Sequence, residues 1–524
     1  MANSERADQS EVIAFLNDPT SYQAHPERVD RCETHAALVF LAGDDAWKIK
    51  RAVRFPYLDF STLEKRRAAC LREVEINRGL APEIYLGCVP ITRGNNQRLA
   101  FGGDGEVVEW AVHMRRFDQA DLLSNVAGAG SLGTDLAKAL ADAAFDSHRT
   151  AARSVDPAGR LRIANVLAPV AASLATLGAV LPQVDVAQFA ERARKRLDRA
   201  GRILDHRARK GFIRRCHGDL HLGNIVLWRG RPVLFDAIEF DEELATIDTL
   251  YDLAFLLMDL DMRGQRPAAN VILNRYVWRS GNLLDLEGLA ALPLLLGLRA
   301  AIRAMVTAQR ALLEQGDTAT RAVETARAYL GAALGYLAPA PPRLLAVGGL
   351  SGTGKSTLAS ALAPAAGPAP GAVHLRSDLE RKSLFGGRET ERLAAEHYTD
   401  ATSAQVYGIL YRKARTALAA GHAVIADAVF SKPEERAAIE AVAAELGTPF
   451  QGLWLTAAPE HLLARVAERG GDASDATPGV VRQQLRWQTG PLSPRWSEVD
   501  GGGSPTETLA CASNLLAQME AAGC

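Results

Sequence analysis

The sequence predicts a two-domain α/β protein, with the boundary at a proline-rich segment. Its 524 residues exceed the size of one ordinary hydrophobic core, so two or three domains are expected. Residues 1–337 combine short strands with long helical stretches, whereas residues 343–524 alternate strands with helices in the manner of a parallel sheet. Residues 338–342 read Ala-Pro-Ala-Pro-Pro, a stiff composition typical of a linker. We therefore expect one domain on each side of this linker.

The composition is that of an ordinary globular protein, with 48% hydrophobic and 23% charged residues. Lysine and arginine number 60 against 61 acidic residues, so the net charge of −1 favours neither nucleic acid nor a membrane surface as a partner. The 6 cysteines lack paired spacing, and the polar N-terminus does not resemble a signal peptide. We expect a cytoplasmic protein with reduced thiols that binds small molecules, and its oligomeric state stays open.

Hydrophobic periodicity gives the order of elements in the N-terminal domain. A short helix precedes a strand hairpin that turns at residues 43–45. Ser61 and Glu64 form a capping-box pattern at the start of the next helix, which Pro82 ends. The apolar residues 288–298 are too short to span a bilayer and predict a buried helix. The expected strands are 36–42, 46–53, 84–90, 97–101 and 107–114, and the other expected helices are 10–17, 61–80, 132–149 and 184–210.

Polar residues with the spacing of a phosphoryl-transfer site follow at residues 217–236. Asp219, Asn224 and Asp236 lie on loops between short predicted strands, where rigid flanks hold them. This layout suits a pocket in which Asp219 orients an acceptor hydroxyl and takes its proton. Asn224 and Asp236 would hold Mg²⁺ on the phosphates. The acidic residues between Glu239 and Asp252 suggest either a cationic acceptor site or, more simply, a solvated helix start.

The stretch His-Gly-Asp-Leu-His-Leu-Gly-Asn at residues 217–224 resembles the catalytic loop of the aminoglycoside phosphotransferase family, relatives of protein kinases, whose pattern is H-G-D-x-x-x-x-N. The resemblance implies a protein-kinase-like bilobal α+β domain that binds ATP with Mg²⁺. It also implies a phosphate-binding lysine, Lys48, with Lys50 on the same strand face as a rival. Glu73 is the expected ion-pair partner of that lysine, ahead of Glu75.

Two further segments bear on this resemblance. Residues 109–116 fall where the family places its hinge to the adenine pocket. Residues 32–35, Cys-Glu-Thr-His, stand where the kinase relatives carry a glycine-rich loop. The way in which the phosphates are covered therefore departs from the pattern.

The C-terminal domain begins with a phosphate cradle. Residues 349–356 fit the pattern G-x-x-x-x-G-K-[ST] and follow the apolar strand Leu344–Val347. Glycines let successive backbone N–H groups turn towards phosphate oxygens, and the following helix adds its positive end. Lys355 would bridge the β- and γ-phosphates, and the Ser356 hydroxyl would ligate Mg²⁺. The predicted nucleotide contacts are Gly349, Ser351, Gly352, Thr353, Gly354, Lys355, Ser356 and Thr357.

Later strands, at 373–375, 423–426 and 450–455, complete the predicted parallel sheet. Residues 343–500 resemble P-loop small-molecule kinases related to gluconate kinase and zeta-toxin-type kinases. That resemblance implies Asp378 as the base for an acceptor hydroxyl, although a helix N-cap explains it as well. Asp427, at the end of a strand, would face Mg²⁺. Arg465 and Arg469 would close on the transferring phosphate, or else form an exposed helix face.

The sequence therefore predicts a fused enzyme with two ATP- and Mg²⁺-dependent phosphotransferase domains that act on hydroxyl groups of sugar-like or related metabolites. One alternative is a single active P-loop kinase, with the N-terminal domain serving as a nucleotide-binding regulator. A second alternative is a zeta-toxin-like kinase. The acceptors, and the choice between ATP and GTP, stay open.

Overall fold

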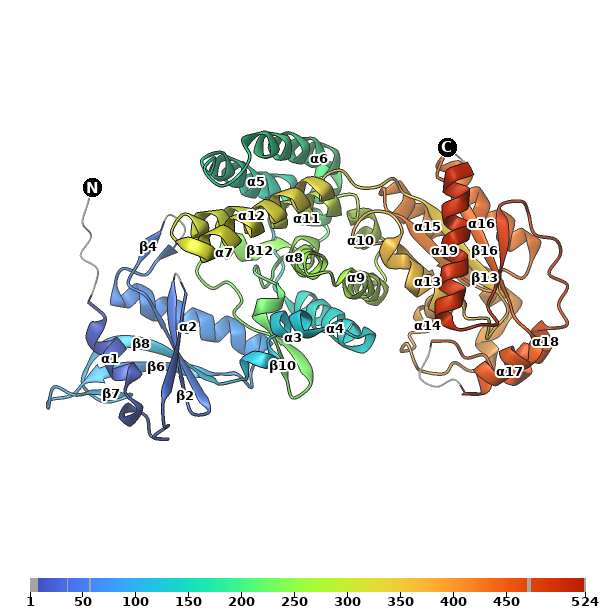
Figure 1. The fold of residues 1–524 in the computed structure, drawn as a ribbon. Helices are drawn as coiled ribbons and strands as arrows, with labels where there is room; N and C mark the ends of the chain where they lie inside the picture. The colour runs from blue at the N-terminus through green and yellow to red at the C-terminus, as the bar shows by residue number, and fades with distance from the viewer. Residues whose placement is uncertain (1–7, 35, 56–57, 469–472, 523–524) are drawn as a thin grey trace. The chain divides into compact units, whose positions relative to one another are not determined.

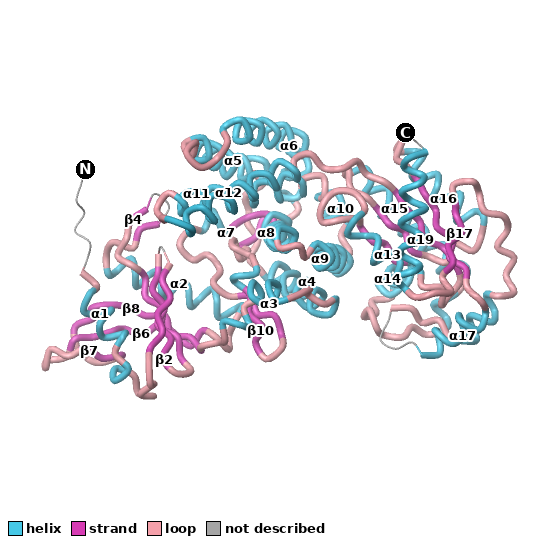
Figure 2. Tube along the Cα trace, viewed as in Figure 1, coloured by secondary structure: helices cyan, strands magenta, loops and turns pink. Residues whose placement is uncertain are grey.

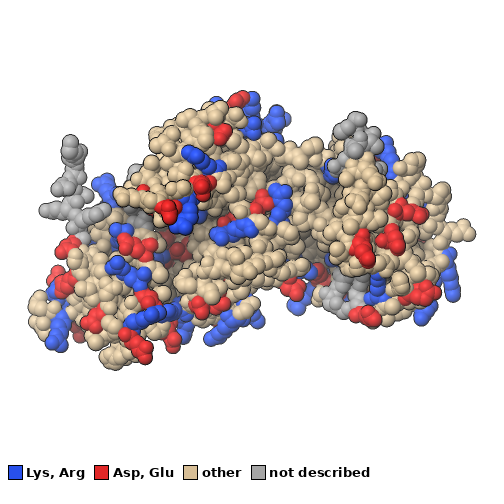
Figure 3. Space-filling model, viewed as in Figure 1, with Lys and Arg blue, Asp and Glu red and all other residues tan. Residues whose placement is uncertain are grey.

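The computed structural model describes residues 8–34, 36–55, 58–468 and 473–522, which fold into two compact units (Figure 1). The first unit comprises Met1–Pro157 and Ala208–Asp259, and the second comprises Ala158–Arg207 and Leu260–Cys524. The linker expected at residues 338–342 lies within the second unit, and the domain boundary there stays a prediction. Charged side chains of both signs are mixed over the face in view in Figure 3, in agreement with the near-neutral net charge.

The first unit is built on a 6-stranded antiparallel sheet of order β1-β2-β3-β8-β6-β7. Two helices cover its two faces. Alternate strand residues point to opposite faces, so Phe40 packs with Leu16 of α1, whereas Leu41 packs with Val74 of α2. The elements are α1 Ser10–Asn17, β1 Val29–Glu33, β2 Ala37–Ala42, β3 Asp45–Lys50, β4 Arg54–Phe55, β5 Leu58–Asp59, α2 Leu63–Leu80, β6 Tyr85–Arg93, β7 Leu99–Phe101 and β8 Glu106–Arg115.

Two local expectations need correction. Thr62, not Ser61, caps helix α2, because its Oγ1 accepts a hydrogen bond from the N–H of Lys65. The expected hinge at residues 109–116 is mostly the second half of strand β8.

The rest of the first unit holds the expected catalytic loop between short strands (Figure 2). β9 pairs with β12, and β10 pairs with β11, both antiparallel. The elements are α3 Leu123–Ala129, α4 Thr134–Thr150, β9 Ile213–Arg215, β10 Ile225–Trp228, β11 Arg231–Leu234, α7 Glu242–Ala245, β12 Thr246–Asp248 and α8 Thr249–Met262, the last of which ends in the second unit.

The second unit contains a helical part and a parallel sheet. The helices of the first part are α5 Gly159–Ala175, α6 Gln183–Arg209, α9 Arg266–Ser280, α10 Leu283–Gly288, α11 Leu292–Ala311 and α12 Gly316–Tyr336. The apolar residues 288–298, expected to form one helix, instead span the end of α10 and the start of α11. Pro293 lies in the first turn of α11, where the absence of a proline N–H costs no helical hydrogen bond. Helix α11 is long and apolar enough to cross a membrane by composition, yet 61% of its most apolar stretch is buried within the protein.

The sheet of the second unit is parallel, with 5 strands in the order β14-β15-β13-β16-β17. This confirms the predicted α/β architecture, although the sequence did not indicate β17. The strands are β13 Leu344–Gly349, β14 Val373–Arg376, β15 Val424–Asp427, β16 Phe450–Thr456 and β17 Trp496–Asp500. The helices are α13 Lys355–Leu362, α14 Ser377–Leu384, α15 Asp400–Ala419, α16 Pro433–Glu445, α17 Pro459–Glu468, α18 Pro478–Gln484 and α19 Pro505–Ala522.

Gly452 on β16 leaves room for the ring of Trp496 on the neighbouring strand. A Cβ at this position would lie 2.1 Å from the Trp496 ring. We expect Gly452→Ala to destabilise the second unit by about 1–3 kcal/mol, because the buried ring has to shift. As a control, Gly408→Ala lies on helix α15 with open space around the added methyl group and should stabilise by about 0.4–1 kcal/mol. Thermal unfolding measures both, and equal shifts for the two variants would contradict this packing.

Candidate active sites

Lys48 stands at the centre of an ion-pair network in the first unit. On strand β3, its Nζ lies 2.9 Å from Oε1 of Glu73 on α2 and 2.6 Å from Oδ1 of Asp236 after β11. The Glu73 side chain is fully buried, whereas that of Asp236 is 39% exposed. Burial alone would lower the pKa of Lys48, but the carboxylates of Asp236 and Glu73 raise it well above its usual value. Glu75, the less favoured candidate, instead pairs with Arg72 at 2.8 Å.

Lys50, two residues along β3, also contacts Glu73 but has a different second partner. Its Nζ lies 2.6 Å from Glu73 Oε2, donates a hydrogen bond to Glu239, and lies 5.4 Å from the centre of the Phe60 ring. The Lys50 side chain is only 3% exposed. Lys50 is therefore enclosed, whereas Lys48 reaches a carboxylate that is open to solvent. Of the two, Lys48 is the better placed to meet a phosphate.

The candidate catalytic loop presents a carboxylate beside an amide. Asn224 donates two hydrogen bonds through Nδ2, to Asp219 Oδ2 and to the Asp219 carbonyl oxygen, each at 3.0 Å. The His221 ring lies 3.4 Å from Asp219 Oδ2, and the Asp219 side chain is 41% exposed. Burial lowers the pKa of His217, whose Nε2 lies 2.9 Å from the Phe235 carbonyl oxygen, so this ring is neutral.

The oxygen atoms of this site suit a hard cation. Asn224 offers an amide oxygen and Asp236 a carboxylate, the ligands that Mg²⁺ prefers. Burial would raise the pKa of Asp236, but the Lys48 ammonium outweighs this and lowers it, so the carboxylate stays ionised. Asp236 also has a backbone φ of 60°, an uncommon conformation for a residue with a side chain. The residues therefore fit a magnesium ion.

A tight turn stands where protein kinases carry a glycine-rich loop. The Thr34 N–H donates to the Ala37 carbonyl oxygen at 2.9 Å, and the Ala37 N–H donates to Thr34 Oγ1 at 2.9 Å. Strand β1 thus turns directly into β2, and His35 lies outside the described residues.

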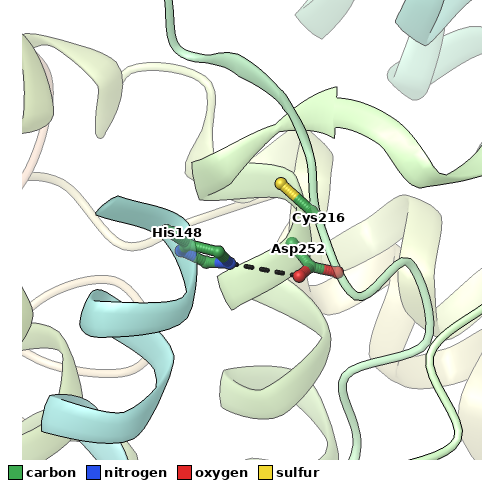
Figure 4. A group of neighbouring side chains, drawn as sticks. All are labelled: His148, Cys216 and Asp252. Atoms are coloured by element: carbon green, nitrogen blue, oxygen red, sulfur yellow. Dashed lines mark hydrogen bonds and ion pairs between the residues drawn. The ribbon is translucent and has the colours of Figure 1, made fainter. Parts of the chain in front are cut away.

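The buried carboxylate of Asp252 anchors the backbone of the catalytic loop. Figure 4 shows it beside His148 and Cys216. Its Oδ1 accepts the N–H of Gly218 at 2.9 Å, and its Oδ2 accepts the N–H of His217 at 3.1 Å and lies 3.1 Å from Nε2 of His148. Asp252, His148 and Cys216 lie close enough together to hold a metal ion. However, both carboxylate oxygens already accept hydrogen bonds, and the Cys216 thiol lies 3.6 Å from a carbonyl oxygen of β12. The group therefore fits a structural anchor better than a metal site.

This anchor corrects the expectation of a solvated helix start between Glu239 and Asp252. Asp248 and Asp252 are buried, at 3% and 0% exposure. Three acids do behave as expected near a helix start: Asp241 caps α7 by accepting the N–H groups of Glu243 and Leu244, and Glu242 and Glu243 lie exposed in its first turn. Asp248, although buried, accepts the N–H of Leu250 at the start of α8.

The phosphate cradle of the second unit joins β13 to α13. Gly349 and Gly352 have φ values of 132° and 88°, and a Cβ at either position would lie within 2.8 Å of a backbone oxygen, so both positions require glycine. Lys355 Nζ donates to the Leu350 carbonyl oxygen at 2.8 Å, which holds it over the loop. Ser356 follows Lys355 in the first turn of α13. The Ser351 N–H is bonded to Oε1 of Gln484 at 2.8 Å, a contact from α18 that the sequence did not indicate.

Two carboxylates meet beside the cradle at the ends of β14 and β15. Burial alone would raise the pKa of Asp427, but the hydrogen bond from His374 and the charges of Arg376 and Lys355 lower it to about 2. Burial raises the pKa of Asp378, and the charge of Asp427 adds to this effect against the opposing charges of Arg376 and Lys355. Asp378 lies in the first turn of α14, whose N-cap residue is Arg376. Asp378 is therefore not the helix cap.

Of the two arginines expected to close on the transferring phosphate, the structure describes only Arg465. The Arg465 guanidinium donates to the carbonyl oxygens of Gly501 and Gly503, at 2.6 and 2.8 Å, and so holds the loop after β17. Its role towards a phosphate stays a prediction. Arg469 lies outside the described residues.

Comparison with known proteins gives a separate family match for each candidate site. Residues 39–291 match the model of the phosphotransferase enzyme family, and residues 344–491 match the model of an AAA domain. Together with the kinase-type sites, these matches define the protein as an ATP-dependent phosphotransferase. The chain is also 32% identical over 491 residues to the uncharacterized proteins Rv2004c of Mycobacterium tuberculosis and Mb2027c of Mycobacterium bovis, an alignment that covers 90% of this chain and 94% of theirs. It belongs to the same family as these mycobacterial proteins.

Solved structures resemble each part separately. A sugar kinase from Janibacter sp. HTCC2649 aligns over 34% of this chain and 95% of its own, with 20% identity and a TM-score of 0.27. The aminoglycoside 2'-phosphotransferase-IIIa aligns over 62% of this chain and 99% of its own, with 13% identity and a TM-score of 0.36. A choline/ethanolamine kinase family protein from Mesorhizobium loti aligns over 63% and 98%, with 15% identity and a TM-score of 0.36.

Substitution of Lys48 and substitution of Lys50 on β3 should have different effects, the first on catalysis and the second on stability. In a Lys355→Ala background, which isolates the first site, Lys48→Ala should lower phosphoryl transfer about 100- to 1,000-fold, because a fixed charge at the phosphates is lost. Lys50→Ala should instead destabilise the first unit by roughly 3 kcal/mol, since it leaves Glu239 buried without its cation. ADP release and thermal unfolding measure the two effects. The assignment is wrong if Lys50→Ala abolishes transfer in a fully folded protein.

Proposed function

We propose that this chain carries two Mg²⁺-dependent kinase sites, each of which transfers the γ-phosphoryl group of ATP to a hydroxyl group of a sugar-like or related small molecule. One observation supports this most strongly: Lys48 is joined to both Glu73 and Asp236 in one half of the sequence, while the other half has its own cradle at residues 349–356. Each half thus has its own cation for phosphate and its own carboxylates. The expected cytoplasmic location stays a prediction.

In the first site, Asp219 is the proposed base. Its exposed carboxylate accepts the proton of the acceptor hydroxyl, while the hydroxyl oxygen forms a bond to the γ-phosphorus and the bond from that phosphorus to ADP breaks. Asn224 orients Asp219 through the bond at Oδ2. Lys48 stabilises the negative charge of the phosphates, and Glu73 fixes Lys48 from its buried position.

In the second site, backbone N–H groups of the cradle and Lys355 bind the phosphates, and Asp378 accepts the proton of the acceptor. Its raised pKa makes it a stronger base than an ordinary carboxylate. In both sites a bound Mg²⁺ would supply positive charge that offsets the negative charge of the phosphates. Asn224 and Asp236 would hold it in the first site, and Ser356 and Asp427 in the second.

A second candidate function is a nucleotide-binding regulatory role for the N-terminal half. The tight turn at Thr34 supports it, because a glycine-rich loop that could enclose the phosphates is replaced there. The pairing of Lys48 with Glu73 and Asp236 favours a catalytic role for this half, because it fixes a cation in position to bind the phosphates of ATP.

Loss of each site should remove a separate activity. ADP release is measured with full-length protein against sugars, nucleosides, amino alcohols and aminoglycosides, and phosphorus NMR of the products reports the phosphorylated position. Asp219→Ala and Lys355→Ala should each lower one activity about 100- to 10,000-fold, and the double variant should lose both. If Asp219→Ala changes no activity while Lys355→Ala removes all of it, the first half is not a kinase.

The pH dependence of the second site should report Asp378. In an Asp219→Ala background, activity requires ionised Asp378 and should be lost as the pH falls through its pKa, which burial places above the ordinary carboxyl value. Asp427 stays ionised in this range because its pKa is about 2. Asp378→Asn should leave a low activity without the acidic decline. An unchanged acidic decline in this variant would exclude Asp378 as the base.

A further inference from the structure

Helix α9 lies against β14, the edge strand of the parallel sheet, within the second unit. Among the described strands, β14 pairs only with β15, so its other side presents backbone groups that need partners. Asn270 and Asn274, one helical turn apart on α9, both donate through Nδ2 to the Ala372 carbonyl oxygen, at 3.0 and 3.1 Å. The N–H of His374 donates to Asn274 Oδ1 at 2.7 Å.

The Asn274 side chain therefore replaces a neighbouring strand. Its amide group donates a hydrogen bond to the carbonyl oxygen of Ala372 and accepts one from the N–H of His374. A neighbouring strand would make the same pair of bonds to this edge. The contact continues into α14, the helix that carries Asp378. Trp278 donates through Nε1 to the Leu379 carbonyl oxygen at 3.2 Å.

The side chain of His374 leads from this contact to the metal-binding carboxylate proposed above. Its Nε2 lies 3.3 Å from Oδ2 of Asp427, and its Nδ1 lies 3.4 Å from Oγ of Ser360 on α13. The ring is largely buried, with 8% of the side chain exposed. Asn274 thus fixes the main chain of a residue whose ring fixes Asp427.

We propose that Asn274 and His374 are positioning residues of the P-loop site, through which helix α9 sets the Asp427 carboxylate for its cation. This inference rests on the proposed function of the second site. A hydrogen bond to the ligating carboxylate orients it, and loss of such an outer partner typically lowers metal affinity about 10- to 100-fold. Residues 343–524 alone would lack this part of their own site, because α9 precedes them in the sequence.

The test uses the full chain with Asp236→Ala, which removes the carboxylate proposed to hold the cation in the first site. Binding of Mn²⁺ in the presence of ADP is followed by electron paramagnetic resonance, and hydrogen exchange is followed in peptides that contain His374. Asn274→Ala should weaken Mn²⁺ binding at least 10-fold and accelerate exchange of the His374 amide. As a matched control, Asn282→Ala removes another asparagine of this region, which caps α10 through the Leu284 N–H, and should change neither quantity.

Variants of the strand itself give a second measurement in case Asn274→Ala unfolds. His374→Ala should weaken Mn²⁺ binding like Asn274→Ala, whereas His374→Gln, whose amide can donate at the position of Nε2, should restore it. The inference is overturned if Asn274→Ala accelerates exchange yet binds Mn²⁺ as tightly as the parent, because α9 then only covers the sheet edge. It is also overturned if His374→Ala binds Mn²⁺ normally.

A Lys355→Ala reference separates failure of the inference from failure of the proposed function. If this variant binds Mn²⁺ and ADP as the parent does, the cradle is not the nucleotide site, and both proposals fail. If it loses binding while Asn274→Ala and His374→Ala keep it, only the positioning role fails.

Discussion

The hydrogen bonds of the Asp252 carboxylate are the constraint on which the first site depends. A catalytic loop has to expose its functional groups, so regular secondary structure cannot hold its backbone. Here the N–H groups of His217 and Gly218 are both bound by one buried carboxylate on α8. The loop thereby shares the rigidity of a packed helix. The Asp219 side chain can remain 41% exposed while the main chain before it is fixed.

The two candidate sites handle phosphate with different parts of the chain. In the first, side chains from β3, α2 and the loops after β9 and β11 converge, and Lys48 is held by partners 25 and 188 residues away in the sequence. In the second, one stretch of eight residues supplies the cradle, and the first turn of α14 and the end of β15 supply the carboxylates. A site formed by one loop can be recognised from a short sequence pattern. A site formed by side chains from distant segments exists only once the whole domain has folded.

This difference explains what the sequence could predict. The cradle and the parallel sheet follow from local patterns, and the structure confirms the fold. The sequence leaves the choice between Lys48 and Lys50 open, because both lie on one strand face. The carboxylates that distinguish them, Asp236 for Lys48 and Glu239 for Lys50, lie 188 and 189 residues away. The acidic pattern places Asp252 with solvated acids, although its apolar neighbours Leu253, Ala254 and Phe255 indicate burial. The role of Asn274 had no signal, since its partner His374 lies 100 residues away.

The cover over strand β14 also has a consequence for biosynthesis. An uncovered edge strand is a template for pairing with other chains, and the danger is greatest while a protein is still being made. Because translation runs from the N-terminus, α9 leaves the ribosome before β14, and the asparagine amides that bind Ala372 are already present when that strand emerges. The order of the two halves along the chain thus makes this cover available before the strand that it meets. A gene that encoded them in the opposite order would leave this edge open to aggregation until synthesis was complete.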